Sequence, residues 1–145
     1  MYKHILLPID GSELSLRAAK EGIELAKLCK ASIYALTVIS PFHQIAYLGT
    51  VLAATEFAYN EDAKTNAERY LADIRALADA AGAPFDSQST LGDQPSEIIV
   101  QTAADKQCDL IVMGSHGWRG MTRLLLGSET QKVLLRSEIP VLVCH

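Results

Sequence analysis

Short runs of β-branched and apolar residues alternate along this chain with longer segments of helical periodicity, and this alternation restricts the fold more than any other feature. Five runs are predicted to be strands: 4–10, 32–39, 85–91, 109–114 and 140–144. Strands that alternate with helices form parallel sheets, because each helix returns the chain to the same end of the sheet. We therefore predict an α/β fold, with helices on both faces of a doubly wound, five-stranded parallel sheet.

Four helices are predicted between the strands. The first follows Ser12, whose hydroxyl can cap the helix start, and the second spans 63–81 and ends at Gly82. The third begins near Pro95, in an acidic first turn, and the fourth follows Ser128.

The third strand differs from the other four in its polarity. Strands buried on both faces read as nearly continuous apolar runs, and four of the runs have this character. The third is polar between Phe85 and Leu91, so we expect it at an edge of the sheet. The 145 residues, 49% of them hydrophobic, are enough for one domain with its own core.

Charge and cysteine usage exclude several classes of protein. The formal net charge is −4 and no stretch concentrates basic residues, which argues against a general nucleic-acid binder. No apolar run is long enough for a membrane span, and the first segment is too soon interrupted for a signal peptide. Cys29, Cys108 and Cys144 are odd in number and scattered, so we expect each to be a small, buried apolar residue in a reducing cytoplasm.

A glycine-rich loop after the fourth strand is the most informative segment for function. In an open parallel sheet, ligands bind at the carboxyl ends of the strands, where the strand order reverses. The loop reads GSHGWRGMTRLLLGSET, with fixed points at Gly114, Gly117, Gly127 and Ser128. Glycines let backbone N–H groups approach an oxyanion, and Ser128, as N-cap of the fourth helix, would add its hydroxyl. Glycines also mark ordinary turns, so the loop alone leaves both interpretations open.

Two common nucleotide-binding fingerprints are absent, since no GxGxxG follows the first strand and no GxxxxGK[ST] occurs. The spacing Gly-x2-Gly-x9-Gly-Ser, at Gly114, Gly117, Gly127 and Ser128, resembles that of the universal stress protein A family in its ATP-binding branch. A Pro-x-Asp at the end of the first strand and a PVLVCH ending are similar to that family as well, so the resemblance covers the whole chain.

The resemblance implies a sheet ordered 3-2-1-4-5 and a stress-response regulator that binds ATP, or AMP or ADP, at the carboxyl ends of strands one, two and four. It implies that Asp10 binds the ribose hydroxyls and that the backbone of Val38 binds adenine. The phosphates would lie against Gly117, Gly127, Ser128 and the amide of Glu129. The remaining residues implied to belong to the site are Pro8, Ile9, Met113, Gly114 and Thr130.

Several residues keep a second interpretation. Asp10 could instead bond its own backbone in a turn. Glu129 departs from the family's small or aliphatic residue, so it is either a solvated side chain or a ligand of a Mg²⁺ ion that bridges it to phosphates. His116 and Arg119 are either phosphate contacts or solvated. With Ser128 and Thr130, His116 also permits an alternative function, a slow ATPase or autophosphorylating enzyme.

Two segments suggest further contacts. Residues 40–56 are apolar for a connection and could form a lid, a partner surface or a packed cover over the sheet. The strand Val141, Leu142, Val143 would expose unpaired backbone if it lies at an edge. Together with the family resemblance, it predicts a homodimer formed by antiparallel pairing of this C-terminal strand across a two-fold axis.

Overall fold

The computed structural model describes residues 1–42, 53–118 and 125–145. Its centre is a five-stranded sheet in which all neighbouring strands are parallel, in the order β3-β2-β1-β4-β5. The strands are β1 (His4–Pro8), β2 (Ser32–Ile39), β3 (Phe85–Leu91), β4 (Leu110–Gly114) and β5 (Val141–Cys144). The predicted fold class and strand order are confirmed, and so is the edge position of the polar third strand.

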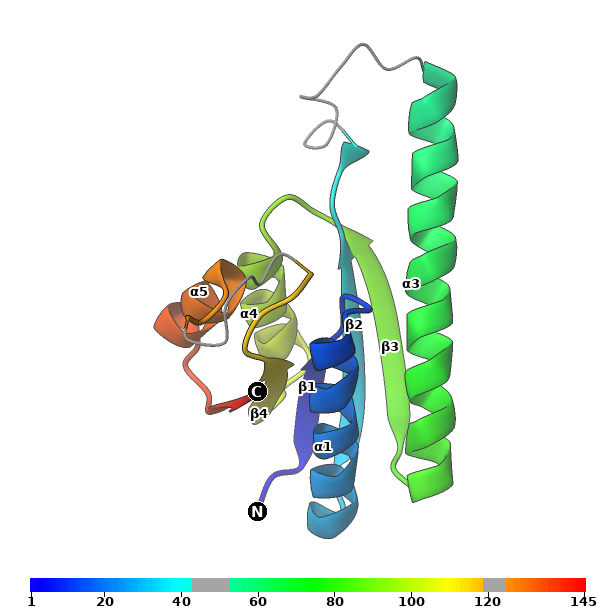
Figure 1. Ribbon diagram of the computed structural model, residues 1–145. Coiled ribbons are helices and arrows are strands. Elements are labelled where there is room, and N and C mark those ends of the chain that lie inside the picture. The colour runs from blue at the N-terminus through cyan, green and yellow to red at the C-terminus, as the bar shows by residue number, and fades with distance from the viewer. Residues whose placement is uncertain (43–52, 119–124) are drawn as a thin grey trace.

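Helices cover both faces of the sheet (Figure 1). The helices are α1 (Glu13–Cys29), α3 (Ala53–Ala81), α4 (Pro95–Asp105) and α5 (Ser128–Arg136). Helices α1 and α3 pack together on one face, and α4 and α5 pack together on the other. The helices that connect β1, β2 and β3 therefore lie on one face, and those that lead to β4 and β5 lie on the other. The strand order reverses between β1 and β4.

The core has two layers because successive side chains of a strand point to opposite faces. The layer beneath α1 and α3 contains these strand residues: Ile5, Leu7, Ile33, Ala35, Leu110 and Val112. The layer beneath α4 and α5 contains the intervening residues: Leu6, Tyr34, Leu36, Ile111 and Met113. Each of these residues is at most 6% exposed, which explains the continuous apolar runs in the sequence.

Three of the predicted signals at helix ends, those at Ser12, Pro95 and Gly82, are confirmed. The hydroxyl of Ser12 accepts a hydrogen bond from the N–H of Ser15 at 3.2 Å and so caps α1. Pro95 occupies the first turn of α4, and Gly82, with φ of +71°, follows the last residue of α3. This left-handed conformation is one that glycine adopts without a steric cost.

Helix α3 is longer than the predicted 63–81, because it begins at Ala53. Of the added residues, 55–58 are exposed, and in Figure 1 the helix extends beyond the sheet, so no apolar periodicity marked its first turns. Residues 53–56 of the predicted 40–56 segment are thus helical, whereas 43–52 lie outside the described residues. Leu77, which fits the apolar period, is 39% exposed, and Ala78 is buried in its place.

The described helices include none that is both long and apolar enough to cross a membrane. The three cysteines are free thiols: Cys108 is buried, whereas Cys29 and Cys144 are only half-buried. The expectation that all three are buried apolar residues is therefore wrong for two of them.

Candidate functional site

A cleft of about 660 Å³ opens at the carboxyl ends of β1, β2 and β4, a volume typical of small-molecule sites. Every residue predicted for the site lines it: Pro8, Ile9, Asp10, Val38, Met113, Gly114, Gly117, Gly127, Ser128, Glu129 and Thr130. These residues come from four separate segments, which the sheet topology brings together at the switch point.

Asp10 holds the turn between β1 and α1 and also faces the cleft. Its Oδ1 accepts a hydrogen bond from the N–H of Ser12 at 2.9 Å, as expected of an Asp that bonds its own backbone. Its Oδ2 lies so close to Gly117 that a Cβ atom there would overlap it. Asp10 therefore does bond its own backbone in a turn through Oδ1, and its Oδ2 lies against the glycine loop.

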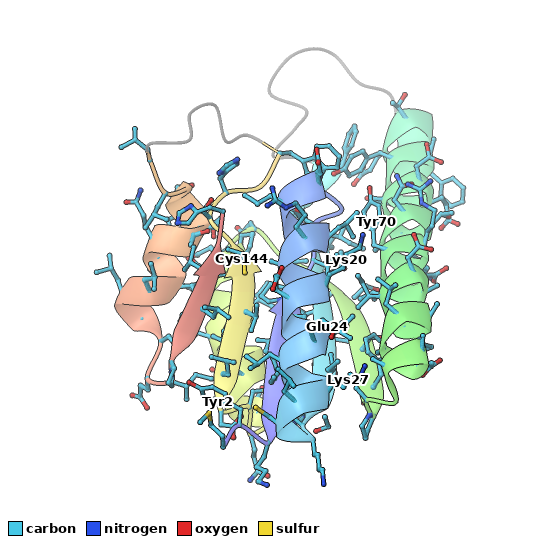
Figure 2. All side chains as sticks on the ribbon, turned by 60° about the horizontal axis from the view of Figure 1, so that its bottom comes forward. Tyr2, Lys20, Glu24, Lys27, Tyr70 and Cys144 are labelled. Atoms are coloured by element: carbon cyan, nitrogen blue, oxygen red, sulfur yellow. The ribbon has the colours of Figure 1, made fainter. Side chains whose placement is uncertain are left out.

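The same turn is fixed from the side of α3 by Tyr70. Gly11 has φ of +80°, and a Cβ atom on it would overlap the Tyr70 ring. Figure 2 shows Tyr70 extending from α3 towards α1. Gly11 is thus required both for its backbone conformation and for the close approach of the ring, which together position Asp10.

The N-terminus of α5 forms one end of the cleft. Gly127, not Ser128 as predicted, is the N-cap, and no side chain caps the helix. The first backbone bond runs from the N–H of Gln131 to the carbonyl of Gly127 at 3.0 Å. The N–H groups of Ser128, Glu129 and Thr130 therefore stay outside the helix ladder, at the positive end of the helix dipole. Such a terminus favours an anion.

The loop that carries these amides is anchored to β4. The N–H of Gly127 donates to the carbonyl of Ser115 at 2.7 Å, and the buried hydroxyl of Thr130 donates to the carbonyl of Gly114 at 3.0 Å. The hydroxyl of Ser115 and Nδ1 of His116 are 3.1 Å apart. Ser115 and Thr130 thus hold the start of α5 against the end of β4.

Glu129 is the second residue of α5 and is half-buried, so it is not the solvated side chain of the first interpretation. Its Oε2 accepts from the N–H of Ser96, and its Oε1 accepts from the Lys132 ammonium, both at 2.9 Å. Burial by itself would raise the pKa of Glu129, but the hydrogen bonds from Lys132 and Ser96 outweigh it and lower the pKa below its usual value. The carboxylate therefore carries its charge at neutral pH.

The Ser96 contact gives Glu129 a structural role. Ser96 lies in the first turn of α4, whose N-cap residue Gln94 forms no side-chain capping bond. Glu129 supplies that bond from another helix. Among the described residues, no group of three or more His, Cys, Asp or Glu side chains is placed to hold a metal ion. A Mg²⁺ ion bridging Glu129 to phosphates would have to share the carboxylate with both of its present donors.

Several lining residues were not predicted from the sequence. Tyr59 on α3 donates its hydroxyl to the carbonyl of Ser40 at 3.0 Å, and burial raises its pKa. Trp118 lies at the rim, 69% exposed, and its Nε1 donates to the carbonyl of Asp10 at 2.7 Å. Tyr59 carried no recognisable motif, and the position of Trp118 in the glycine loop was its only signal. Arg119 lies outside the described residues.

Thr37 is the clearest omission. It lines the cleft, is 4% exposed, and its hydroxyl has no hydrogen-bond partner among the described residues. Thr37 lies on the same side of β2 as Ile33 and Ala35, which face α3. The alternation of side chains along the strand therefore predicts a place in the apolar core for Thr37 and no role at a ligand site. A threonine in an otherwise apolar strand was the only signal.

Replacement of this hydroxyl is expected to have opposite effects on stability and binding. Thr37→Val should stabilise the ligand-free protein by about 1 kcal/mol, because a buried hydroxyl without a partner is costly. If a ligand supplies the partner, the same variant should bind that ligand about fivefold more weakly. Urea unfolding and calorimetry measure the two effects, and Thr90→Val on the edge strand is the control. Unchanged binding would assign the hydroxyl no role towards the ligand.

The fold and the cleft together define a doubly wound α/β protein whose candidate site lies at the topological switch point. The chain belongs to the universal stress protein family, whose model matches residues 1–145. The resemblance inferred from the glycine spacing is thereby confirmed.

Similar proteins extend over nearly the whole chain. Universal stress protein MJ0531 of Methanocaldococcus jannaschii is 36% identical over 145 residues, which cover 99% of this chain and 82% of that protein. The solved structure of protein MJ0577 from the same organism aligns with a TM-score of 0.86 and 30% identity, covering 99% of this chain and 96% of that one. A universal stress protein solved in complex with cAMP aligns with a TM-score of 0.68 and 27% identity, covering 99% and 97%.

Proposed function

We propose that this protein binds an adenine nucleotide, ATP or a nucleotide with fewer phosphates, in the cleft and acts as a stress-response regulator. The observation that carries the proposal is the N-terminus of α5, which opens on the cleft with no capping side chain. Its free N–H groups suit a phosphate, and the Oδ2 of Asp10 suits a ribose hydroxyl. The proposed setting is the cytoplasm, which agrees with three free thiols.

The apolar wall of the cleft supports the base end of this proposal. Val38, Pro95, Ile99 and Met113 all line the cleft. Such side chains provide a flat, dry surface for a purine ring, while the backbone of Val38 at the end of β2 can bond the base edge. A related universal stress protein was solved in complex with cAMP, an adenine nucleotide, which supports the choice of base.

Nucleotide release tests the proposal directly. Protein purified without added ligand is denatured, and the released small molecules are identified by mass spectrometry. Calorimetry then measures the binding of adenosine, AMP and ATP to ligand-free protein. We expect at least one adenine nucleotide to be released or bound at micromolar concentration, and guanosine nucleotides to bind more weakly. If no adenine compound binds, the proposal is wrong.

We also propose that the protein forms a homodimer through β5. This strand is an outer strand of the sheet, next to β4. The carbonyls of Pro140 and Cys144 accept from the N–H groups of Ile111 and Ser115, at 3.0 and 2.8 Å. Along a strand, the N–H and C=O groups of successive residues point alternately to its two sides. Those of Val141 and Val143 therefore point to the free edge. That edge can pair with the same strand of a second copy.

Proline at this edge should separate the dimer. Val143→Pro removes an N–H that points to the free edge, so we expect the mass in light scattering to fall towards 15.7 kDa. Leu142 lies between the residues bonded to β4, so proline there would also break a bond inside the sheet. Val143→Ile keeps the N–H and should remain dimeric. A wild-type mass of one chain at micromolar concentration would contradict the proposed dimer.

A further inference from the structure

The start of α4 depends on α5 for one backbone hydrogen bond. Pro95, the first residue of α4, has no N–H, and the N–H groups of the third and fourth residues both donate to the carbonyl of Gln94. The N–H of Ser96, the second residue, has no such partner within its own helix and donates to Oε2 of Glu129 at 2.9 Å. Glu129 therefore completes the first turn of α4.

Water cannot replace Glu129 at this N–H. Ser96 is only 1% exposed, so its backbone is shielded from solvent. A buried N–H without a partner is costly, so loss of the carboxylate would favour movement of the first turn of α4 towards water. Lys132, the other partner of Glu129, has a side chain that is 50% exposed, so water can solvate its ammonium group when the carboxylate is absent.

The Glu129 contact links the two ends of the proposed nucleotide site. On α5, the N–H of Glu129 is one of the free amides proposed to hold phosphate, and the hydroxyl of Thr130 fixes this turn to the carbonyl of Gly114. On α4, Pro95 precedes Ser96 and belongs to the apolar wall proposed for the purine. Because α5 is the helix against which α4 packs (Figure 1), the position of this wall depends on the contact.

We propose that Glu129 is a positioning residue, whose bond to Ser96 holds Pro95 at the spacing from the α5 amides that an adenine nucleotide requires. The bond thereby raises the affinity of the cleft for the base. This inference rests on the proposed function and assigns to it a residue that acts on the ligand through the start of α4. Because the base is common to adenosine and AMP, both should lose affinity to the same extent when the bond is lost.

The test separates the reach of the Glu129 side chain from its charge. Glu129→Gln removes the charge but keeps an oxygen that can accept from Ser96. Glu129→Asp keeps the charge but is one methylene shorter, and Glu129→Ala removes the acceptor altogether. Calorimetry measures adenosine and AMP on wild type and on each variant, under conditions in which urea unfolding shows the variant to be fully folded. A loss of stability alone then leaves the measured affinity unchanged.

We expect Glu129→Ala and Glu129→Asp to bind both ligands about tenfold more weakly, as the loss of one hydrogen bond to a buried group implies. Glu129→Gln should stay within about twofold of wild type. Two controls should bind as wild type does. Lys132→Ala removes the other partner of Glu129, and Arg136→Ala removes an exposed ion pair with Glu97 that also joins α5 to the first turn of α4 but does not line the cleft.

Three outcomes would overturn the inference. Wild-type affinity in folded Glu129→Ala or Glu129→Asp would leave Glu129 with a structural role alone. An equal loss in Glu129→Gln would trace the effect to the charge instead of the bond to Ser96. An equal loss in Arg136→Ala would trace it to the general packing of α4 on α5. Failure of both adenosine and AMP to bind wild type would overturn the proposed function as well, and so is distinguishable from these results.

Discussion

Gly127→Val is expected to weaken nucleotide binding about 100-fold, because displacement of a binding group by about 1 Å has an effect of this size. A Cβ atom on Gly127 would lie 2.9 Å from the Cα of His116 and 3.3 Å from the carbonyl oxygen of Ser115. Both atoms belong to the backbone that follows β4, which cannot move aside independently of the strand. The start of α5 must therefore move away from β4. The N–H groups proposed to hold phosphate move with it.

The same contact predicts a loss of stability. Insertion of an isopropyl group at a close-packed site should lower the free energy of unfolding by about 2 kcal/mol. Gly127 therefore does more than leave space for a ligand, because it also allows the start of α5 to lie close to Ser115 and His116. Urea unfolding gives the stability, and calorimetry with AMP gives the affinity.

Gly82→Asn is the matched control for this variant. Gly82 also has a special backbone conformation, but no atom lies within 4 Å of a Cβ built there, and it is remote from the cleft lining. Asparagine tolerates the left-handed region, so the control should lose less than about 1 kcal/mol and keep its AMP affinity. Equal AMP affinity of Gly127→Val and wild type would exclude the loop from the site.

Asp10→Ala is the second variant with a large expected effect, again about 100-fold on nucleoside binding, because hydrogen bonds to a charged group are strong. Alanine also removes the bond from Oδ1 to the N–H of Ser12, so the free energy of unfolding should fall by about 1 kcal/mol. Adenosine is the ligand of choice, since it contains the ribose hydroxyls and no phosphate.

Asp10→Asn separates the two roles of this residue. Its Oδ1 can still accept from Ser12, so stability should stay within about 0.5 kcal/mol of wild type. The position of Oδ2 is taken by an amide that donates, so binding of adenosine should remain weak. If Asp10→Asn binds adenosine as tightly as wild type, Asp10 serves the turn alone.

Short-range patterns in the sequence predicted the architecture because they depend on physics within a few residues. The apolar runs of the strands, the Ser12 cap and Gly82 each act locally, and each is found where it was predicted. The spacing of Gly114, Gly117 and Gly127 likewise indicated the family and the loop. The start of α3 was missed, since its first turns are exposed and carry no apolar stripe.

The tertiary structure decided the roles that depend on packing between distant segments. Glu129 caps a helix at Ser96, 33 residues earlier, and no pattern in the chain specifies how α4 and α5 lie against each other. The buried hydroxyl of Thr37 acquires its meaning only because the end of β2 lies in the cleft. Local sequence therefore determined which elements form and where the glycines of the loop lie. The side chains that share the cleft were determined by the packing of helices on the sheet, because contact energies across the core depend on all of its residues together.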